Sequence, residues 1–193
     1  PRRAPSMDDD RAVPVAEERR AGGRLHGKQR PVHAMGYCLG GTLLAIAAAA
    51  MARDGDERLA SMTLFAAQTD FTEAGELSLF IDESQVAYLE DMMWDRGYLD
   101  SRQMAGAFQM LRSNDLIWSR VIHDYLMGER APMFDLMAWN ADSTRMPAGV
   151  HSFYLRECYL ANKLAQGKMV LDNVRIDLKK VKVPAYNLAA RDD

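Results

Sequence analysis

A cysteine between two glycines is the residue in this sequence best suited to covalent chemistry. Cys38 lies in the segment GYCLGG at residues 36–41, which has the pattern G-x-C-x-G. A thiolate can attack a carbonyl carbon and carry the acyl group as a covalent intermediate, so the pattern indicates acyl transfer. The alternative interpretation is that Cys38 is a small buried apolar residue in a glycine-containing turn, because free cysteines are most often buried.

The segments on either side of Cys38 predict a strand before it and a helix after it. Val32–Met35 is a short apolar run, and Thr42–Arg53 is an alanine-rich run of helical length. A nucleophile on a sharp strand-to-helix turn is typical of the α/β-hydrolase elbow, here with Cys in place of Ser. We expect Gly36 and Gly40 to form this elbow, because residues without a Cβ let the strand and helix cross closely.

The predicted elbow surrounds the sulfur with groups that stabilise negative charge. The first N–H groups of a helix have no intrahelical acceptor, and the helix dipole favours a thiolate at that end. The N–H of Leu39, the residue after the nucleophile, is expected to be one of two oxyanion-hole donors.

The pattern downstream predicts a second core strand and then a long helical insertion. Leu59–Phe65 is the strand, and residues 66–71 leave the edge of the sheet at which ligands bind in α/β folds. Amphipathic helices are predicted at residues 84–94, 101–111 and 114–126, with Asn114 as the cap of the third. We interpret the insertion as a cap domain over the active site.

Four methionines belong to the predicted cap. They suit a surface that repacks or touches lipid-like chains, and the alternative is that they are core residues. These methionines are Met92, Met93, Met104 and Met110.

The last part of the chain is predicted to return to the core. Residues 153–164 form an amphipathic helix, and Cys158 within it is expected to be packed and inert. A hairpin is predicted around Asp172-Asn173, followed by a core strand at 183–188. The predicted organisation therefore has four parts. Residues 1–30 are a polar, disordered or divergent N-terminal segment, and residues 31–71 are the elbow part of the core. Residues 72–151 are the cap, and residues 152–193 return to the core. A short surface helix at 16–21 is the alternative within the first segment.

Composition excludes several classes of function. The 193 residues carry a formal net charge of −3, which gives no indication of nucleic-acid binding. Two cysteines form no disulfide framework, which fits a reducing cytosol. No apolar run approaches the roughly 18 residues of a membrane span. The four histidines lack metal-ligand spacing, and no cofactor-binding fingerprint is present, so we expect neither a metal nor a cofactor.

Several segments together resemble one enzyme family. The elbow segment GYCLGGTLLAIAAAA looks like the lipase-box-like segment of the polyhydroxyalkanoate synthases, the bacterial enzymes that polymerise (R)-3-hydroxyacyl-CoA. The motif SNDLIW is similar to the family's R-P-N-D-L-x-W, with Arg112 and Ser113 where Arg and Pro usually stand. WNADST is similar to W-N-x-D-x-T. The downstream matches are at residues 80–83, 113–118, 139–144, 154–156 and 183–186, and the resemblance runs from about Val32 to Asp193.

The resemblance implies a fold and a set of site residues. The fold is an α/β-hydrolase core, incomplete in this chain, with a helical cap. Cys38 is the nucleophile, and Asp193, preceded by Asp192, is the triad acid. Trp139 and its loop lie near the nucleophile or the subunit contact, and the alternative is a buried anchor aromatic with Asp142 capping a turn. The family's catalytic histidine lies further downstream, whereas His26, His33, His123 and His151 precede the acid, so the chain is expected to be a fragment of low activity.

The function implied is an acyltransferase that uses hydroxyacyl-CoA and builds a polyester chain through a Cys acyl-enzyme. The implied location is the cytoplasm or the surface of polyester granules, and the implied assembly is a homodimer formed through the cap. Two alternatives remain open from the residues. One is a Cys-nucleophile hydrolase, such as an esterase, lactonase or polyester depolymerase. The other is a non-catalytic segment that only dimerises or associates with granules.

Overall fold

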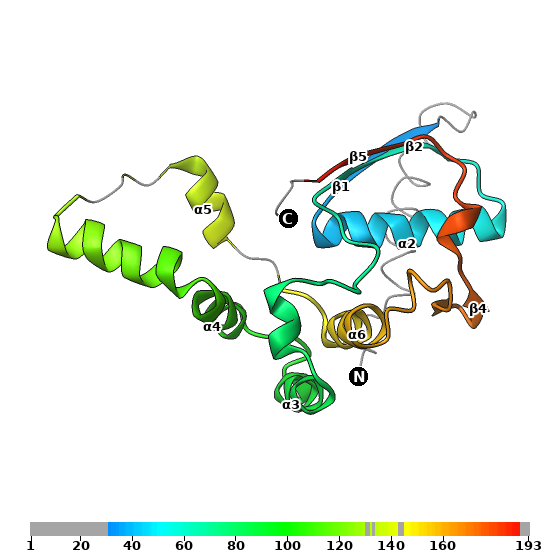
Figure 1. Cartoon of the computed structure of the whole chain (residues 1–193). Coiled ribbons are helices and arrows are strands. Elements are labelled where there is room, and N and C mark those ends of the chain that lie inside the picture. The colour runs from blue at the N-terminus through cyan, green and yellow to red at the C-terminus, as the bar shows by residue number, and fades with distance from the viewer. Residues whose placement is uncertain (1–30, 130–131, 133, 143–144, 190–193) are drawn as a thin grey trace. The chain divides into compact units, whose positions relative to one another are not determined.

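The described chain forms two compact units. The computed structural model describes residues 31–129, 132, 134–142 and 145–189. The core unit contains residues 31–74 and 153–189, and the helical unit contains residues 75–152 apart from the gaps just named (Figure 1). The predicted N-terminal segment 1–30 lies outside the described residues.

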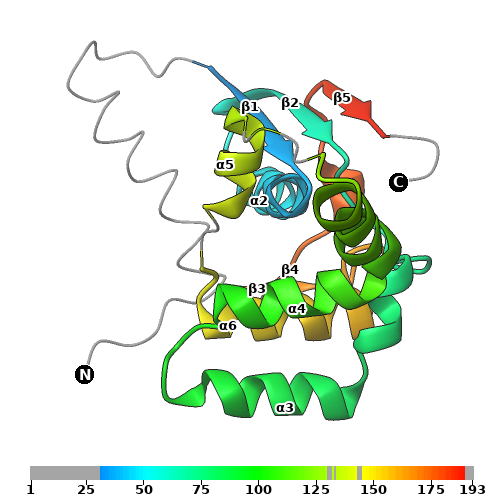
Figure 2. The same cartoon turned by 90° about the vertical axis from the view of Figure 1, so that its left-hand side faces the viewer.

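A parallel sheet with one helix on its face forms the framework of the core unit. The strands β1 (Val32–Tyr37), β2 (Leu59–Phe65) and β5 (Ala185–Leu188) run parallel in the order β1-β2-β5. The helix α2 (Leu39–Asp54) joins β1 to β2 and lies along the sheet (Figures 1 and 2). It ends at Gly55, which has a φ of 68° and donates its N–H to the Met51 carbonyl. The predicted strand–helix–strand order is confirmed, and the α/β class with it.

Small side chains let α2 pack closely on the strands. Ala45, Ala48, Ala49 and Ala50 are all buried on this helix. Opposite them, Met62 and Leu64 lie two residues apart on β2 and point to the same face, and the β1–β2 register is irregular before them, next to Leu59. The buried cluster between helix and sheet consists of Ala48, Leu59, Met62 and Leu64, with Ala34, Leu44, Met51, Ala67, Val181 and Val183 packed around it.

The strand β5 differs from its prediction. It covers only Ala185–Leu188, and all four of its residues are exposed. The strand pairs with β2 through Met62–Phe65, which confirms its place in the sheet. The prediction of a core strand is therefore wrong for its side chains. In the described structure they lie at the sheet's edge, and Val181 and Val183 before the strand are the residues that reach the core cluster.

The segment that returns to the core is helical and then forms a hairpin. It is helical through α6 (Ala148–Phe153) and η4 (Tyr154–Leu160), so the predicted helix begins earlier and ends earlier than expected. The strands β3 (Val170–Leu171) and β4 (Val174–Arg175) pair antiparallel. Asp172 and Asn173 between them both have positive φ, as a tight hairpin turn needs, so the predicted hairpin is confirmed. A short helix, η5 (Leu178–Lys180), follows and contacts α2.

The helical unit is built from short helices. In chain order they are η1 (Glu76–Phe80), α3 (Glu83–Trp94), α4 (Ser101–Leu111), η2 (Asn114–Trp118), η3 (Val121–Leu126) and α5 (Asp135–Ala141). The bounds of α4 match the prediction. Asp82 caps α3 by accepting a hydrogen bond from the Gln85 N–H at 2.8 Å. Among the described residues, none of the helices has both the length and the apolar character of a membrane span.

Backbone and side-chain contacts link the end of α3 to the start of α6. The Ala148 N–H donates to the Gly97 carbonyl at 2.8 Å, and Tyr98 forms a bridge with Pro147. The Arg145 guanidinium lies 4.6 Å from the centre of the Tyr98 ring. The Ser152 hydroxyl also donates to the Glu90 carboxylate, so α3 is linked to α6 along its length as well as at its end.

Three predictions in the helical unit need correction. Asn114 does not cap a helix, because the preceding Ser113 already has helical backbone angles and η2 continues the helix. Trp139 lies in α5 instead of a loop, and 65% of its surface is exposed, so it is not a buried anchor. The four methionines do not share one environment, since Met93 is 1% exposed and Met110 is 68% exposed.

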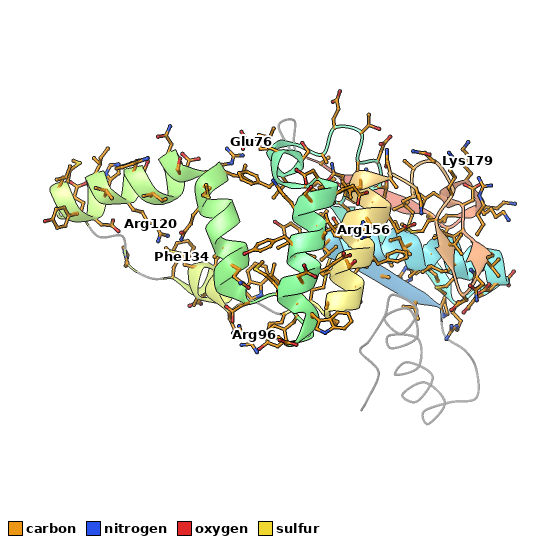
Figure 3. The ribbon with its side chains drawn as sticks, turned by 90° about the horizontal axis from the view of Figure 1, so that it is seen from below. Glu76, Arg96, Arg120, Phe134, Arg156 and Lys179 are labelled. Atoms are coloured by element: carbon orange, nitrogen blue, oxygen red, sulfur yellow. The ribbon has the colours of Figure 1, made fainter. Side chains whose placement is uncertain are left out.

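The side chains of Arg120 and Phe134, also in this unit, are exposed to solvent (Figure 3).

Candidate active site

Cys38 occupies a strained turn between β1 and α2. Its φ is 51° and its ψ is −122°, a region that residues with a side chain rarely enter. The Cys38 N–H donates to the Phe65 carbonyl at 2.9 Å, and its own carbonyl accepts from Gly41 and Thr42 at 2.9 and 3.2 Å. These bonds fix the turn from both sides. Cys38 is exposed, so the alternative of a buried apolar cysteine is wrong.

The close crossing of strand and helix depends on Gly36 and Gly41. A Cβ on Gly36 would lie 2.5 Å from the Gly41 Cα and 2.6 Å from the Gly40 carbonyl oxygen. A Cβ on Gly41 would lie 2.3 Å from the Ala67 Cβ. A Cβ on Gly40 would meet nothing within 4 Å. The close contacts at Gly36 are those that the predicted elbow needs, and the second close approach is made by Gly41 instead of Gly40.

The N-terminus of α2 presents free amides beside the sulfur. Leu39 and Gly40 are the first two residues of the helix, so their N–H groups have no acceptor within it. Gly40 is exposed and carries no side chain to cover these donors. The start of α2 can therefore donate hydrogen bonds to an oxyanion formed on a carbonyl carbon attached to Cys38.

The three parallel strands end at one edge of the sheet, and the ends are linked in a row. Cys38 follows β1 and bonds to Phe65 at the end of β2. Ala66 follows β2, has a φ of 46°, and donates its N–H to the Leu188 carbonyl at the end of β5 at 2.8 Å. This edge is the one at which ligands bind in open α/β sheets.

An aromatic cluster packs within the core unit around Phe71. The rings of Tyr154 and Tyr159 on η4 lie 5.8 and 4.8 Å from the Phe71 ring, and 5.4 Å from each other. Thr42, in the first turn of α2, is fully buried and donates its hydroxyl to the Gln68 carbonyl at 2.6 Å. Burial holds the pKa of the Tyr154 phenol well above its usual range, and the neighbouring Tyr159 raises it further.

Asn162 holds the aromatic cluster in place. It follows η4 with a φ of 45°, in the left-handed region that asparagine tolerates. Its Oδ1 accepts from the Phe71 N–H at 3.0 Å, while its Nδ2 donates to Asp70 at 2.8 Å and to Thr72 at 3.0 Å. These bonds join the loop after β2 to the end of η4. Hydrogen bonds from the Thr72 hydroxyl, the Asn162 Nδ2 and the Thr72 N–H lower the pKa of the Asp70 carboxyl.

The three described histidines differ in their surroundings. His33 lies on β1, and its Nδ1 is 2.7 Å from the Ser61 hydroxyl. Five residue-to-residue steps of extended chain lead from it to Cys38, a distance of about 16 Å at roughly 3.3 Å per step, so it does not reach the sulfur. In the helical unit, His123 is exposed, whereas His151 is buried and burial lowers its pKa, which keeps its imidazole neutral. His26 lies outside the described residues.

Cys158 is packed in the interior, as predicted. Its side chain is completely buried, and burial, with the neighbouring Glu157, raises the pKa of its thiol to about 12. Asp192 and Asp193 lie outside the described residues, so the predicted triad acid remains a prediction. Among the described residues, no group of His, Cys, Asp and Glu side chains is arranged to bind a metal ion.

Sequence reasoning did not identify Gly41 and Thr42 as parts of the elbow, and it did not identify the aromatic cluster around Phe71. The adjacent pair Gly40-Gly41 was visible, but only the crossing with Ala67 shows which glycine is required. Tyr159 offered one signal, its position five residues after Tyr154 on a predicted amphipathic helix. That signal does not specify which surface the helix covers.

The chain is similar to curated bacterial polymerases over most of its length. It is 57% identical over 162 residues to a poly(3-hydroxyalkanoate) polymerase of Methylorubrum extorquens, which covers 84% of this chain and 27% of that protein. It is 53% identical over 165 residues to the Rhizobium meliloti subunit of that name, covering 86% and 27%. It is 34% identical over 189 residues to the Cupriavidus necator subunit, covering 95% and 31%.

The chain thus spans between a quarter and a third of the length of these relatives. No protein-family model matches it. The matched segments include most of the chain, and the matched proteins share one name across several bacteria. The chain belongs to the poly(3-hydroxyalkanoate) polymerase family.

Proposed function

We propose that the chain is the nucleophile-bearing part of an acyltransferase that joins (R)-3-hydroxyacyl units from CoA thioesters into polyester. The observation that carries the proposal is the exposed Cys38 at a φ of 51°, where β1 ends and α2 begins. The names of the relatives support this chemistry over simple hydrolysis, because they are polymerases.

In the first step, the Cys38 thiolate attacks the thioester carbonyl of the hydroxyacyl-CoA. The carbonyl oxygen becomes an oxyanion, and the Leu39 N–H at the start of α2 donates a hydrogen bond to it. The C–S bond to CoA then breaks, CoA leaves as a thiolate that takes up a proton, and the acyl group remains on Cys38. Exchange of one thioester for another is nearly neutral in free energy, which suits a cysteine nucleophile.

In the second step, the 3-hydroxyl of another unit attacks the acyl group on Cys38. A new ester C–O bond forms, the C–S bond to Cys38 breaks, and the sulfur leaves as the thiol or thiolate ready for another cycle. The polyester grows by one unit for each cycle.

Asp193 is the acid of the triad in this proposal. Two strand spacings, about 10 Å, separate β1 from β5. Five residues beyond Leu188 can extend at most about 17 Å. The row of strand ends at one edge therefore supports a carboxylate at position 193 close enough to orient a base beside Cys38.

Acylation by (R)-3-hydroxybutyryl-CoA tests the proposal. We expect one acyl group per chain by intact mass, with release of CoA. Cys38→Ser should remove the added mass and leave the circular dichroism spectrum unchanged, because the two side chains are similar in size. Cys158→Ala is the matched control and should keep the label, since Cys158 is buried.

The products separate the proposal from its rivals. Polymer with free CoA supports the transferase, whereas free hydroxy acid would favour the hydrolase alternative. A chain that binds polyester granules without ever carrying an acyl group would favour the non-catalytic alternative. Acyl labelling that persists in Cys38→Ser would show that the nucleophile is elsewhere.

We also propose that the helical unit is the cap of the active site and the contact of a homodimer formed on polyester granules in the cytoplasm. Many large apolar side chains of η2, η3 and α5 are exposed, more than an isolated surface normally carries. They are Ile117, Trp118, Val121, Ile122, Tyr125, Leu126, Leu136 and Trp139. The molar mass in solution tests the dimer. Tyr125→Asp should lower it to that of one chain, and Tyr88→Asp, an exposed residue of α3, should not.

A further inference from the structure

One face of the parallel sheet carries exposed apolar side chains. The helix α2 packs against the other face, at Ala34, Met62 and Leu64 (Figure 1). Because side chains alternate along a strand, the residues next to these point away from α2. They include Met35 and Tyr37 of β1, which are 72% and 64% exposed.

The register of the strands joins such side chains into rows. Each row has one residue from each of the three strands, and neighbouring strands lie about 4.8 Å apart. The rows are Met35–Thr63–Tyr186 and Tyr37–Phe65–Leu188, and together they form the open face. Tyr186 and Leu188 are 59% and 47% exposed. Single exposed apolar residues are ordinary on a protein surface, whereas an apolar surface that continues across three strands marks an interaction site.

The side of the sheet that carries the open face becomes polar at the end far from Cys38. His33 on β1 and Ser61 on β2 are paired in register there, and the His33 Nδ1 lies 2.7 Å from the Ser61 hydroxyl oxygen. A partner that covers this side therefore needs an apolar stripe and a polar group at one end.

The parallel pairing of the strands indicates that the partner is a helix. The strands β1, β2 and β5 are parallel throughout. Sheets of this kind have helices on both faces, because the connections between parallel strands are helical and pack on either side. The helix α2 supplies one of these two layers. A second helix on the open face would complete the arrangement.

The dimensions of the open face fit one helix. Three strands span two strand spacings, about 10 Å, and a helix with its side chains is about 10–12 Å wide. The six residues of β1 extend about 20 Å at roughly 3.3 Å per residue. A helix of about 13 residues has the same length. The helix α2, which covers the opposite face, has 16 residues.

The relatives contain enough further sequence to supply this helix. The matched segments are 27% of the Methylorubrum extorquens polymerase and 31% of the Cupriavidus necator subunit, so more than two thirds of each lies outside the match. We propose that the open face is the docking surface for an amphipathic helix from this unmatched part of a polymerase. The apolar stripe of that helix lies on the rows of Met35 and Tyr37, and a polar residue lies beside His33. The inference concerns packing alone, so it does not depend on acylation of Cys38.

Oxidation of methionine by hydrogen peroxide tests whether the open face is covered, because the reagent must reach the sulfur. Three methionines of this chain serve as probe and references. Met35 lies on the open face, Met110 on α4 is similarly exposed at 68%, and Met93 is 1% exposed. In the chain alone, we expect Met35 and Met110 to be oxidised at similar rates and Met93 far more slowly, as measured by peptide mass spectrometry.

The same three residues are then followed in a chimeric polymerase. In it, the matching segment of the Methylorubrum extorquens polymerase, 57% identical, is replaced by the segment of this chain. Met35 should now be oxidised about tenfold more slowly than Met110, since its exposure falls from 72% to the few per cent of a core residue. Circular dichroism and gel filtration check that the chimera is folded. The Rhizobium meliloti polymerase, 53% identical, is the host if the first chimera is insoluble.

A pair of tyrosine variants shows which surface provides the protection. In the chimera, Tyr186→Lys on the open face should raise the rate of Met35 oxidation toward that of the chain alone. Tyr88→Lys, an equally exposed tyrosine on α3, is the matched control and should leave that rate unchanged.

Two results would overturn the inference. One is a folded chimera in which Met35 is oxidised as fast as Met110. The other is seen in the chain alone, without any chimera. If Met35 is oxidised slowly there and its rate rises on dilution, a second copy of the chain covers the open face.

Discussion

Adding one methyl group at Gly41 should destabilise the fold, while adding it at Gly40 should not. A Cβ at position 41 would lie 2.3 Å from the Ala67 Cβ, whereas carbon atoms in contact normally stay about 3.5–4.0 Å apart. The helix or the loop after β2 would have to move by more than an ångström. Overpacking of this kind costs about 1–3 kcal/mol. In a chain of this size, each kcal/mol lowers the unfolding midpoint by roughly 2–4 °C, so the expected loss is about 2–12 °C.

Gly40→Ala is the matched control because it makes the same chemical change one residue away. Its Cβ meets nothing within 4 Å, and alanine favours a helix over glycine by up to about 1 kcal/mol. Thermal unfolding followed by circular dichroism at 222 nm measures both variants, and urea unfolding gives the free energies. The reasoning is refuted if Gly41→Ala is as stable as the wild type, or if Gly40→Ala loses as much as Gly41→Ala.

Three further predictions concern Asn162, Cys38 and Asp70. Asn162→Ala should be about 1 kcal/mol less stable in urea than Asn162→Gly, because both lose the side-chain bonds but only alanine is strained at a φ of 45°; equal stabilities would contradict this. Cys38→Gly should unfold at a higher temperature than Cys38→Ala, since glycine removes about 1–3 kcal/mol of strain. The Thr72 hydroxyl and Asn162 lower the pKa of Asp70, so its stabilising effect is present above the ordinary value of 3.8 and lost as pH falls through the lower folded value. Asp70→Asn should therefore flatten the acid limb of the stability curve, and an unchanged limb would show that the Asp70 charge does not contribute.

The elements predicted correctly are those whose signals are local. The strand of β2 and the helix α4 have the expected bounds, because apolar runs and periodicity fix them within a few residues. The helix α2 ends at Asp54, one residue beyond the predicted run, and Gly55 caps it. The elbow itself is also a local feature, since its glycines, its nucleophile and the following helix lie within a short stretch of the chain.

The features that sequence reasoning missed depend on contacts between distant segments. Gly41 is required because Ala67, well beyond it in the chain, lies against it. The apolar sequence of β5 suggested a core strand, but only its pairing partner and its position at the sheet edge determine its exposure. Trp139 stands among residues that favour turns, and the first turn of α5 carries Asp135, whose charge stabilises a helix N-terminus.

Strain at the site is shared between two neighbouring strand ends. Cys38 and Ala66 both have positive φ, although neither is a glycine, and such angles persist only where surrounding bonds hold them. The Cys38 N–H donates to the Phe65 carbonyl, and the Ala66 N–H donates to the Leu188 carbonyl. Each strained turn is therefore held by a hydrogen bond to the adjacent strand. The ladder of the sheet thus supplies the constraint that lets a side chain, and with it a sulfur, occupy a position where glycine would be more stable. Weakening the pairing of β5 would therefore loosen Ala66 first, and then the Phe65 carbonyl on which the angle of the nucleophile depends.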